Sequence, residues 1–99
     1  RLEGQGVTAN AVHPGVVATG LRREAPPNAR EPKNPLTPQA GAVGPLHLAM
    51  SPTLANITGR YFEGTEQMPA SGAANDVKLQ ERLWALSRQL LKLPPEAER

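Results

Sequence analysis

Few side chains in this sequence are of the types that usually carry out chemistry, and two of them are histidines. His13 and His47 are the only histidines, and the chain has no cysteine. Histidine acts as a general base or a metal ligand when partner groups lie at suitable spacing, and neither residue has a nearby Cys, Asp or Glu at metal-binding spacing. We interpret both as structural or surface residues, and the sequence predicts no metal site.

The remaining candidates are two arginines, one tryptophan and a glycine pair. Arg22 and Arg23 have guanidinium groups that could meet a phosphate or an acidic substrate, although a solvated loop is the simpler interpretation. Trp84 falls in a predicted helix, where packing is a commoner role than forming a substrate platform. Gly41 and Gly44 also belong to a helical stretch and do not form a dinucleotide-binding fingerprint.

The composition limits the classes of partner. The chain has 99 residues, with 11 basic and 9 acidic side chains and a formal net charge of +2. These charges form no basic stripe, so we expect no nucleic-acid partner. No apolar run approaches the roughly 18 to 20 residues of a membrane span, so no transmembrane segment is predicted. The absence of cysteine is compatible with a reducing compartment, and we expect a cytoplasmic location.

The strands that would position a site are indicated by apolar runs between turn signals. Residues 7–13 form a short apolar-rich run that Pro14 and Gly15 terminate, and they predict a first strand. Residues 59–63 hold the only tyrosine and the only phenylalanine, and they predict a second strand. Between the strands, residues 22–36 are rich in proline and charge, and they predict a loop.

Two helices are predicted from their caps and apolar spacing. Thr37 and Pro38 suit the N-cap and first position of a helix that ends near Met50. A second, amphipathic helix begins at a cap formed by Asn75 or Asp76 and ends before two prolines. Its leucines are spaced by four, three and four residues: Leu79, Leu83, Leu86 and Leu90.

The order strand, loop, helix, strand, helix predicts an α/β fold with a βαβ crossover and a parallel strand pair. Parallel sheets are normally covered by helices on both faces, which two strands and two helices cannot provide. Glycines at positions 4 and 6 are typical of a helix end, which suggests that residues 1–3 finish a helix that begins upstream. We therefore expect a thin core and an edge portion of a larger α/β domain.

Two motifs resemble a known family. Residues 6–19, GVTANAVHPGVVAT, contain the pattern V-x-x-N-x-V-x-P-G-x-V-x-T, which is similar to the sixth strand and following turn of short-chain dehydrogenases/reductases. Residues 57–62, ITGRYF, resemble the family's last strand, and the following Leu83-Trp84 helix resembles that of retinol-dehydrogenase-like members. The resemblance covers most of the chain except residues 22–36 and the tail.

The resemblance implies that the chain is a C-terminal fragment of such a protein. The implied fold is the edge portion of a Rossmann-like doubly wound parallel sheet. Residues 1–93 would be the C-terminal part of a single Rossmann-like domain, with the proline-rich loop inside it, and residues 94–99 would be a frayed tail.

The family's Pro-Gly turn implies part of a site for NAD or NADP. In the family this turn lies against the nicotinamide end of the cofactor. The residue three positions after the proline offers backbone groups to the carboxamide, and the threonine five positions after it also binds cofactor. Carried over to this sequence, the cofactor-binding residues are Pro14, Gly15, Val17 and Thr19. Pro14 and Gly15 are expected mainly to shape the turn.

The catalytic motifs of the family do not occur in this sequence. They are a glycine-rich phosphate loop and a Tyr-x-x-x-Lys pair, in which the lysine lowers the tyrosine pKa for proton transfer. Tyr61 is the only tyrosine and Thr65 stands where the lysine is needed, so no catalytic residue is expected here. An isolated chain of this sequence is expected to be inactive.

Two classes of function follow from these observations. The chain is predicted to be part of an NAD(P)-dependent oxidoreductase that transfers hydride between nicotinamide and a small-molecule alcohol or carbonyl substrate. The alternative is a truncated, non-catalytic homologue that acts as an interaction or regulatory module. The sequence is compatible with a homo-oligomer, and the coding region before Arg1 would discriminate the two classes.

Overall fold

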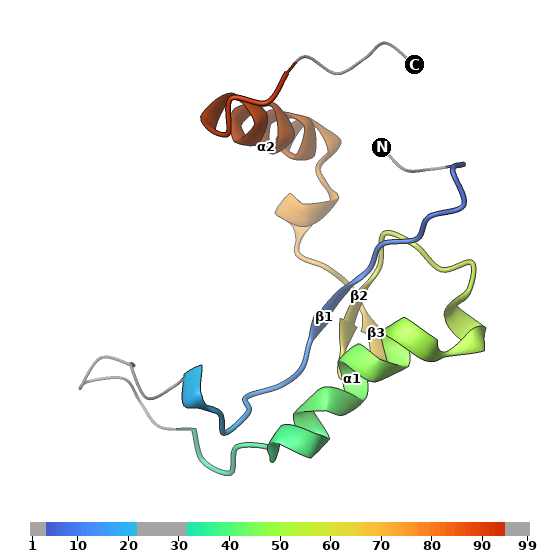
Figure 1. Ribbon diagram of the computed structural model, residues 1–99, viewed down its shortest axis with the longest axis vertical. Helices are drawn as coiled ribbons and strands as arrows, with labels where there is room; N and C mark the ends of the chain where they lie inside the picture. Colours follow the sequence, from blue (N-terminus) through green and yellow to red (C-terminus); the bar gives the residue numbers. More distant parts are fainter. Residues whose placement is uncertain (1–3, 22–31, 95–99) are drawn as a thin grey trace. The chain divides into compact units, whose positions relative to one another are not determined.

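The computed structural model describes residues 4–21 and 32–94, and the chain divides into two compact units, residues 1–69 and 70–99. The first unit contains, in chain order, strand β1 (Ala11–His13), helix α1 (Pro38–Met50), a 3₁₀ helix (Pro52–Leu54), strand β2 (Tyr61–Glu63) and strand β3 (Glu66–Met68). The second unit contains a 3₁₀ helix (Gly72–Asn75) and helix α2 (Val77–Leu90), as Figure 1 shows.

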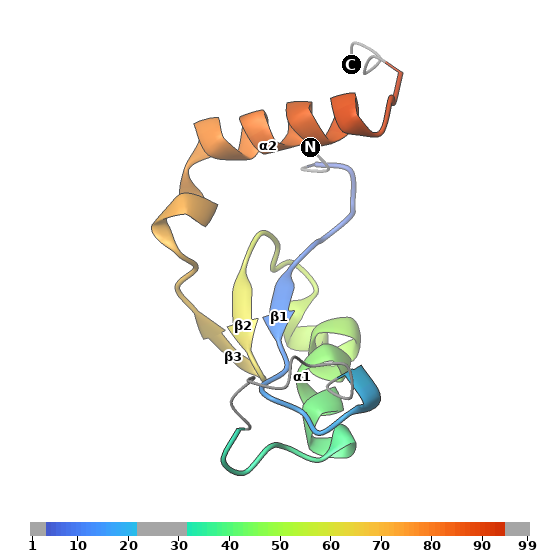
Figure 2. The ribbon, with the colours of Figure 1, turned by 90° about the vertical axis from the view of Figure 1, so that its left-hand side faces the viewer.

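The two predicted strands pair in parallel, as the βαβ order predicts. Ala11 lies opposite Tyr61 and His13 lies opposite Glu63 in the register of β1 and β2. Helix α1 lies in the connection between them and contacts β1, and it is beside the strands in both views (Figures 1 and 2). The predicted parallel pair with a helical crossover is therefore confirmed.

Strand β3 was not predicted, and it makes the sheet mixed. It pairs with β2 in the antiparallel direction, so the strand order is β1-β2-β3. The two strands are joined by a two-residue turn in which Gly64, with a φ of 58°, takes the first position, as in a type II′ hairpin. Residues Glu66–Met68 have low intrinsic strand propensity, so the turn glycine was the only usable signal.

The strand segments are shorter than predicted, and side-chain bonds add to the backbone bonds between the two segments at one end. The amide of Asn10 donates to the carbonyl of Ile57 at 2.8 Å and its oxygen accepts from the N–H of Arg60 at 3.0 Å. One residue earlier, the Ala9 N–H donates to Thr58 Oγ1 at 3.0 Å. These bonds satisfy backbone groups that would otherwise need a longer strand.

Helix α1 has the predicted bounds and caps. Thr37 is its N-cap, and the threonine hydroxyl accepts from the Ala40 N–H at 3.2 Å. Pro38 takes the first turn, where its missing N–H costs no helical hydrogen bond. The helix ends at Ser51, directly before Pro52.

The buried face of α1 consists of glycines, and the apolar residues that predicted the helix are exposed. Gly41 and Gly44 are buried, whereas Val43, Leu46 and Met50 are exposed. A Cβ at Gly44 would lie 2.6 Å from the carbonyl oxygen of the turn residue Gly64. The helix therefore approaches the hairpin so closely that only glycine fits there without displacement. The apolar spacing therefore predicted the helix but not its buried face.

The apolar core is thin, as the composition suggested. Among the described residues, Phe62 on the middle strand β2 is the only large apolar side chain that is fully buried, at 2% exposure. A single buried aromatic side chain supplies a small share of the stabilisation typical of a domain. Within residues 4–21 and 32–94, no helix has the length and apolar character needed to cross a bilayer.

The second unit confirms the predicted amphipathic helix and its cap. Asp76 Oδ1 accepts from the N–H groups of Lys78 at 2.9 Å and Leu79 at 3.3 Å, which satisfies two free donors of the first turn. The four spaced leucines are between 45% and 73% exposed. The local sequence therefore specifies the helix without specifying what its apolar stripe packs on.

The C-terminal end of α2 is a Schellman-type cap with lysine in the glycine position. Lys92 has a φ of 51°, in the left-handed region, and its N–H donates to the carbonyl of Gln89 at 3.1 Å. The Leu93 N–H donates to the carbonyl of Arg88 at 3.1 Å. Both bonds satisfy carbonyls of the last turn. The rest of the predicted frayed tail, residues 95–99, and the predicted helix end at residues 1–3 lie outside the described residues.

Candidate functional site

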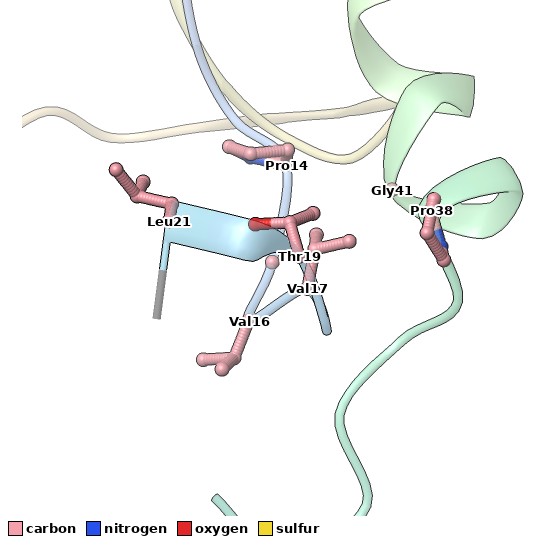
Figure 3. Close-up of a pocket in the computed structure, with 8 residues that line it drawn as sticks. Pro14, Val16, Val17, Thr19, Leu21, Pro38 and Gly41 are labelled. Carbon is pink, nitrogen blue, oxygen red and sulfur yellow. The ribbon is translucent and has the colours of Figure 1, made fainter. Parts of the chain in front are cut away.

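All four predicted cofactor-binding residues line one cavity of about 500 Å³ in the first unit. The described residues that line it are Pro14, Gly15, Val16, Val17, Thr19, Leu21, Pro38 and Gly41, shown in Figure 3. The cavity begins where β1 ends and is closed on one side by the first turn of α1. Its position at the carboxyl end of a parallel strand is where α/β sheets usually bind ligands.

The wall that follows β1 is a tight turn anchored at both ends. The carbonyl of His13 accepts from the N–H of Gly64 at 3.0 Å, which holds the end of β1 to the sheet. Two residues later, the Gly15 N–H donates to Nδ1 of the His13 imidazole at 2.9 Å. Gly15 has a φ of 91°, and a Cβ there would lie 2.7 Å from Leu36 Cδ1. Both observations explain why glycine follows Pro14.

Val17 is held by a short parallel bridge to Leu36. The bridge is made by the Ala18 N–H, which donates to Leu36 O at 3.0 Å, and by the Leu36 N–H, which donates to Val16 O at 2.8 Å. Neither bond uses the N–H or C=O of Val17 itself. In an extended segment these two groups point away from the bridged neighbour, so they face the side opposite Leu36.

The side chain of Val17 packs against the beginning of α1. A Cβ at Gly41 would collide with both methyl groups of Val17, and Figure 3 shows Val17 on the side of Pro38 and Gly41. Gly41 therefore lets the helix close this side of the cavity. The glycine that looked unfavourable in a helix is explained by this close approach.

Thr19 supplies the only polar side-chain group among the eight lining residues. Its hydroxyl can both donate and accept a hydrogen bond, whereas the other side chains of the lining are apolar or absent. None of the eight described lining residues carries a titratable side chain. The described part of the cavity wall can therefore bind and orient a flat, partly apolar group with a polar edge.

Tyr61 lies on β2 and does not line the cavity. Partial desolvation raises the pKa of its phenol, and the charge of Glu63 and a 3.2 Å hydrogen bond to that carboxylate raise the pKa further. Tyr61 thus remains protonated near neutral pH, which is the opposite of what a tyrosine general base requires.

Of the other residues weighed from the sequence, Gly41 lines the cavity, whereas His47 is not among the described lining residues. His47 is half-buried on α1, and Trp84 is 41% exposed on α2 in the second unit. Arg22 and Arg23 lie outside the described residues, as does most of the predicted proline-rich loop. In the part of the chain that the structure describes, no three metal-ligating side chains come together.

Sequence reasoning missed two residues that build the cavity. Leu36 holds the Val16–Ala18 segment through its backbone and packs beside Gly15, and nothing in its proline-rich context indicated a bridge. His13 was treated as an isolated side chain, although its place directly before Pro-Gly could have suggested a role in the turn.

The fold and the cavity together are typical of α/β proteins that bind a ligand at the end of a parallel strand. A parallel β1-α1-β2 unit, extended by β3, is a small α/β arrangement that is compatible with a portion of a Rossmann-like sheet, and its cavity lies at the strand end where such folds bind ligands. No family model matches the chain, and no solved structure matches it.

The chain is similar in sequence to several curated proteins. The chain is 35% identical to human retinol dehydrogenase 13 over 103 aligned residues, which cover 94% of this chain and 31% of that protein. It is 40% identical to mouse retinol dehydrogenase 12, with 92% of this chain and 30% of the relative covered. It is 37% identical to bovine dehydrogenase/reductase SDR family member 13, with coverage of 96% and 27%.

The chain is therefore similar to a segment of short-chain dehydrogenases/reductases, among them retinol dehydrogenases. It spans about 30% of the length of the curated relatives, in agreement with the expectation of a fragment.

Proposed function

We propose that this chain supplies the wall that holds the nicotinamide end of NAD or NADP in a short-chain dehydrogenase/reductase. The observation that carries the proposal is that Pro14, Gly15, Val17 and Thr19, which the family motif assigns to the cofactor, line a single cavity. Relatives that are named retinol dehydrogenases support an oxidoreductase role for the complete protein.

The chemistry of the wall fits a nicotinamide ring and its carboxamide. The ring is flat and has apolar faces, which suits the apolar lining. The carboxamide needs hydrogen-bond donors and acceptors, which the N–H and C=O of Val17 and the hydroxyl of Thr19 can supply. A cavity of about 500 Å³ lies within the usual range for a small-molecule site.

The wall contributes binding and orientation rather than proton transfer. When bound, NAD(P) supplies or accepts the hydride at its nicotinamide ring. Val17 and Thr19 would fix the carboxamide and therefore the face of the ring that is presented to the substrate, while the Val17 side chain packs against the beginning of α1 on one side of the cavity. The substrate would be a small-molecule alcohol or carbonyl compound, with retinol-like compounds suggested by the names of the relatives.

The chain by itself is expected not to bind the cofactor. The family's diphosphate site is a glycine-rich loop at a helix N-terminus, and this sequence has no such loop. Titration of the 99-residue chain with NADPH, followed by fluorescence, should show no saturable binding and no oxidation of NADPH with any carbonyl compound. Tight saturable binding would contradict the assignment of the wall as a partial site.

The role of the wall in catalysis can be tested in a chimera. The chain would replace the aligned segment of human retinol dehydrogenase 13, whose remaining sequence is expected to supply the diphosphate site and the catalytic tyrosine. The proposal predicts retained NAD(P)-dependent oxidoreductase activity. A chimera that melts cooperatively but has no activity would favour the alternative, a non-catalytic interaction or regulatory module. Sequencing the coding region before Arg1 would show independently whether the catalytic motifs are present there.

A further inference from the structure

The end of β1 and the wall of the cavity are joined by one imidazole. His13 has its backbone in the sheet, where its carbonyl accepts from Gly64 N–H at 3.0 Å. Its side chain reaches forward, and Nδ1 accepts from the Gly15 N–H at 2.9 Å. Gly15 lines the cavity and His13 does not. The imidazole therefore acts on the cavity only through Gly15.

The bond has the geometry of an Asx turn. In such a turn the side-chain oxygen of Asn or Asp accepts from the backbone N–H two residues later. Nδ1 of histidine is separated from Cα by the same number of covalent bonds as Oδ1 of asparagine, so it can take the same place. Accepting this bond requires Nδ1 to be unprotonated, with the proton of the neutral ring on Nε2.

Without this bond, few interactions would fix the backbone conformation of the turn. Pro14 has no N–H and constrains only its own φ, and Gly15 is at a φ of 91°, which glycine reaches as readily as several other conformations. The next fixed point is the bridge from Val16 and Ala18 to Leu36. Between the sheet and that bridge, the His13–Gly15 bond is the one hydrogen bond among the described residues that a side chain of the turn itself makes.

We propose that His13 is a positioning residue of the cavity: its neutral imidazole holds the Gly15 N–H and so fixes the Pro14–Val17 wall relative to the end of β1. The inference rests on the proposed function only for the identity of the ligand as nicotinamide. The position of the wall is a property of the chain without any ligand.

Two substitutions at His13 separate the hydrogen bond from the shape of the ring. His13→Phe keeps a planar ring but removes the acceptor. His13→Asn removes the ring but keeps an acceptor at the position of an Asx turn. If the hydrogen bond fixes the turn, His13→Asn should restore the turn conformation that His13→Phe loses. If the shape of the ring fixes it, His13→Asn should not restore it.

The experiment is NMR of the full 99-residue chain, labelled with ¹⁵N, for the unaltered sequence and both variants. In the unaltered chain the ¹⁵N shifts of the His13 ring should show an unprotonated, hydrogen-bonded Nδ1, with His47 in the same spectrum as the reference imidazole. His13→Phe should speed exchange of the Gly15 amide by about 2- to 10-fold and shift the signals of Val17 and Thr19. His13→Asn should return both to near the original values.

The amide of Gly59 is the internal control, because it donates to Ala9 O at 2.8 Å near the other end of β1. Its exchange should be the same in all three chains, whereas general unfolding would accelerate Gly59 and Gly15 together. Equal Gly15 exchange in the unaltered chain and His13→Phe, failure of Asn to restore it, or unprotected Gly15 in every chain would overturn the inference. Because no cofactor is added, these results do not depend on the proposed nicotinamide role, which the chimera tests separately.

Discussion

The two compact units of this chain differ in the kind of contact found within each of them. In residues 4–69, partners far apart in the sequence meet: Asn10 bonds to the segment before β2, and Gly44 touches the hairpin turn at Gly64. In residues 70–94, the cap of α2 joins neighbours in the sequence, since Asp76 accepts from Lys78 and Leu79. The cavity lies in the first region. Long-range contacts thus build the site, while local signals build the helix.

This difference predicts how each region responds to substitution. Changes at close contacts in the first unit should cost stability and disturb the cavity wall. Changes on the exposed stripe of α2 should cost little in this chain, and caps should matter more than leucines there. Four sets of variants test the contrast.

The largest effect is expected at Phe62, which is 2% exposed, compared with Leu83, which is 66% exposed. Phe62→Ala should cost about 3–5 kcal/mol, enough to abolish cooperative unfolding of the first unit in a chain with so thin a core. Leu83→Ala should cost less than about 1 kcal/mol in the same chain. In urea titrations followed by circular dichroism, Phe62→Ala should lose the transition of the first unit and Leu83→Ala should keep a midpoint near that of the unaltered chain; equal effects of the two variants would refute the contrast.

The leucine stripe offers a second use of the same variant. We hypothesise that in a complete dehydrogenase domain α2 packs on the sheet, which would raise the cost of Leu83→Ala to about 2–5 kcal/mol. Lys78→Ala, on another face of the helix, should remain nearly neutral. Equal melting shifts for these two variants in the retinol dehydrogenase chimera would mean that the buried face is assigned wrongly.

Alanine substitutions at two glycines should change stability by an intermediate amount, and the two changes should have opposite signs. A Cβ at Gly44 would lie 2.6 Å from a backbone oxygen, whereas a Cβ at Gly72 in the second unit meets nothing within 4 Å. Gly44→Ala should create strain of about 1–3 kcal/mol, offset in part by about 1 kcal/mol of helix propensity. Gly72→Ala should be neutral or stabilising by up to about 1 kcal/mol. If thermal melts show both variants stabilised, the close approach of α1 and the hairpin is not maintained in solution.

The smallest stability effect is expected at the cap of α2. Asp76→Ala removes the acceptor for two N–H groups and should cost about 1 kcal/mol, while Asp76→Asn should retain most of the stability. The helical signal at 222 nm and the amide exchange of Lys78 should report the loss. No change in either measurement would indicate that the helix does not depend on its local cap.

The elements that were predicted well are those whose signals are local. The spacing of the leucines and the Asp76 cap predicted α2, and Thr37 with Pro38 predicted the start of α1. The four residues that the family motif assigns to the cofactor line one cavity, and their binding of the cofactor stays a prediction.

What failed to be predicted depends on contacts between distant residues. The buried face of α1 was missed because Gly41 and Gly44 are buried by close approach and not by hydrophobicity. β3 was missed because its pairing depends on the Gly64 turn rather than on strand propensity. The role of Leu36 arises from a bridge to Val17 that crosses a loop.

The central claim is that the wall with Val17 and Thr19 binds the nicotinamide end of the cofactor, and Thr19 tests it most directly. In the retinol dehydrogenase chimera, steady-state kinetics would be measured for Thr19→Ala, for Thr19→Ser, which keeps the hydroxyl, and for Thr65→Ala in the exposed hairpin turn. Loss of one hydrogen bond, worth about 0.5–1.5 kcal/mol, should raise the KM for NAD(P)H about 2- to 10-fold in Thr19→Ala. Thr19→Ser and Thr65→Ala should stay close to the unaltered chimera. Unchanged cofactor kinetics in Thr19→Ala, in an active chimera, would contradict the claim.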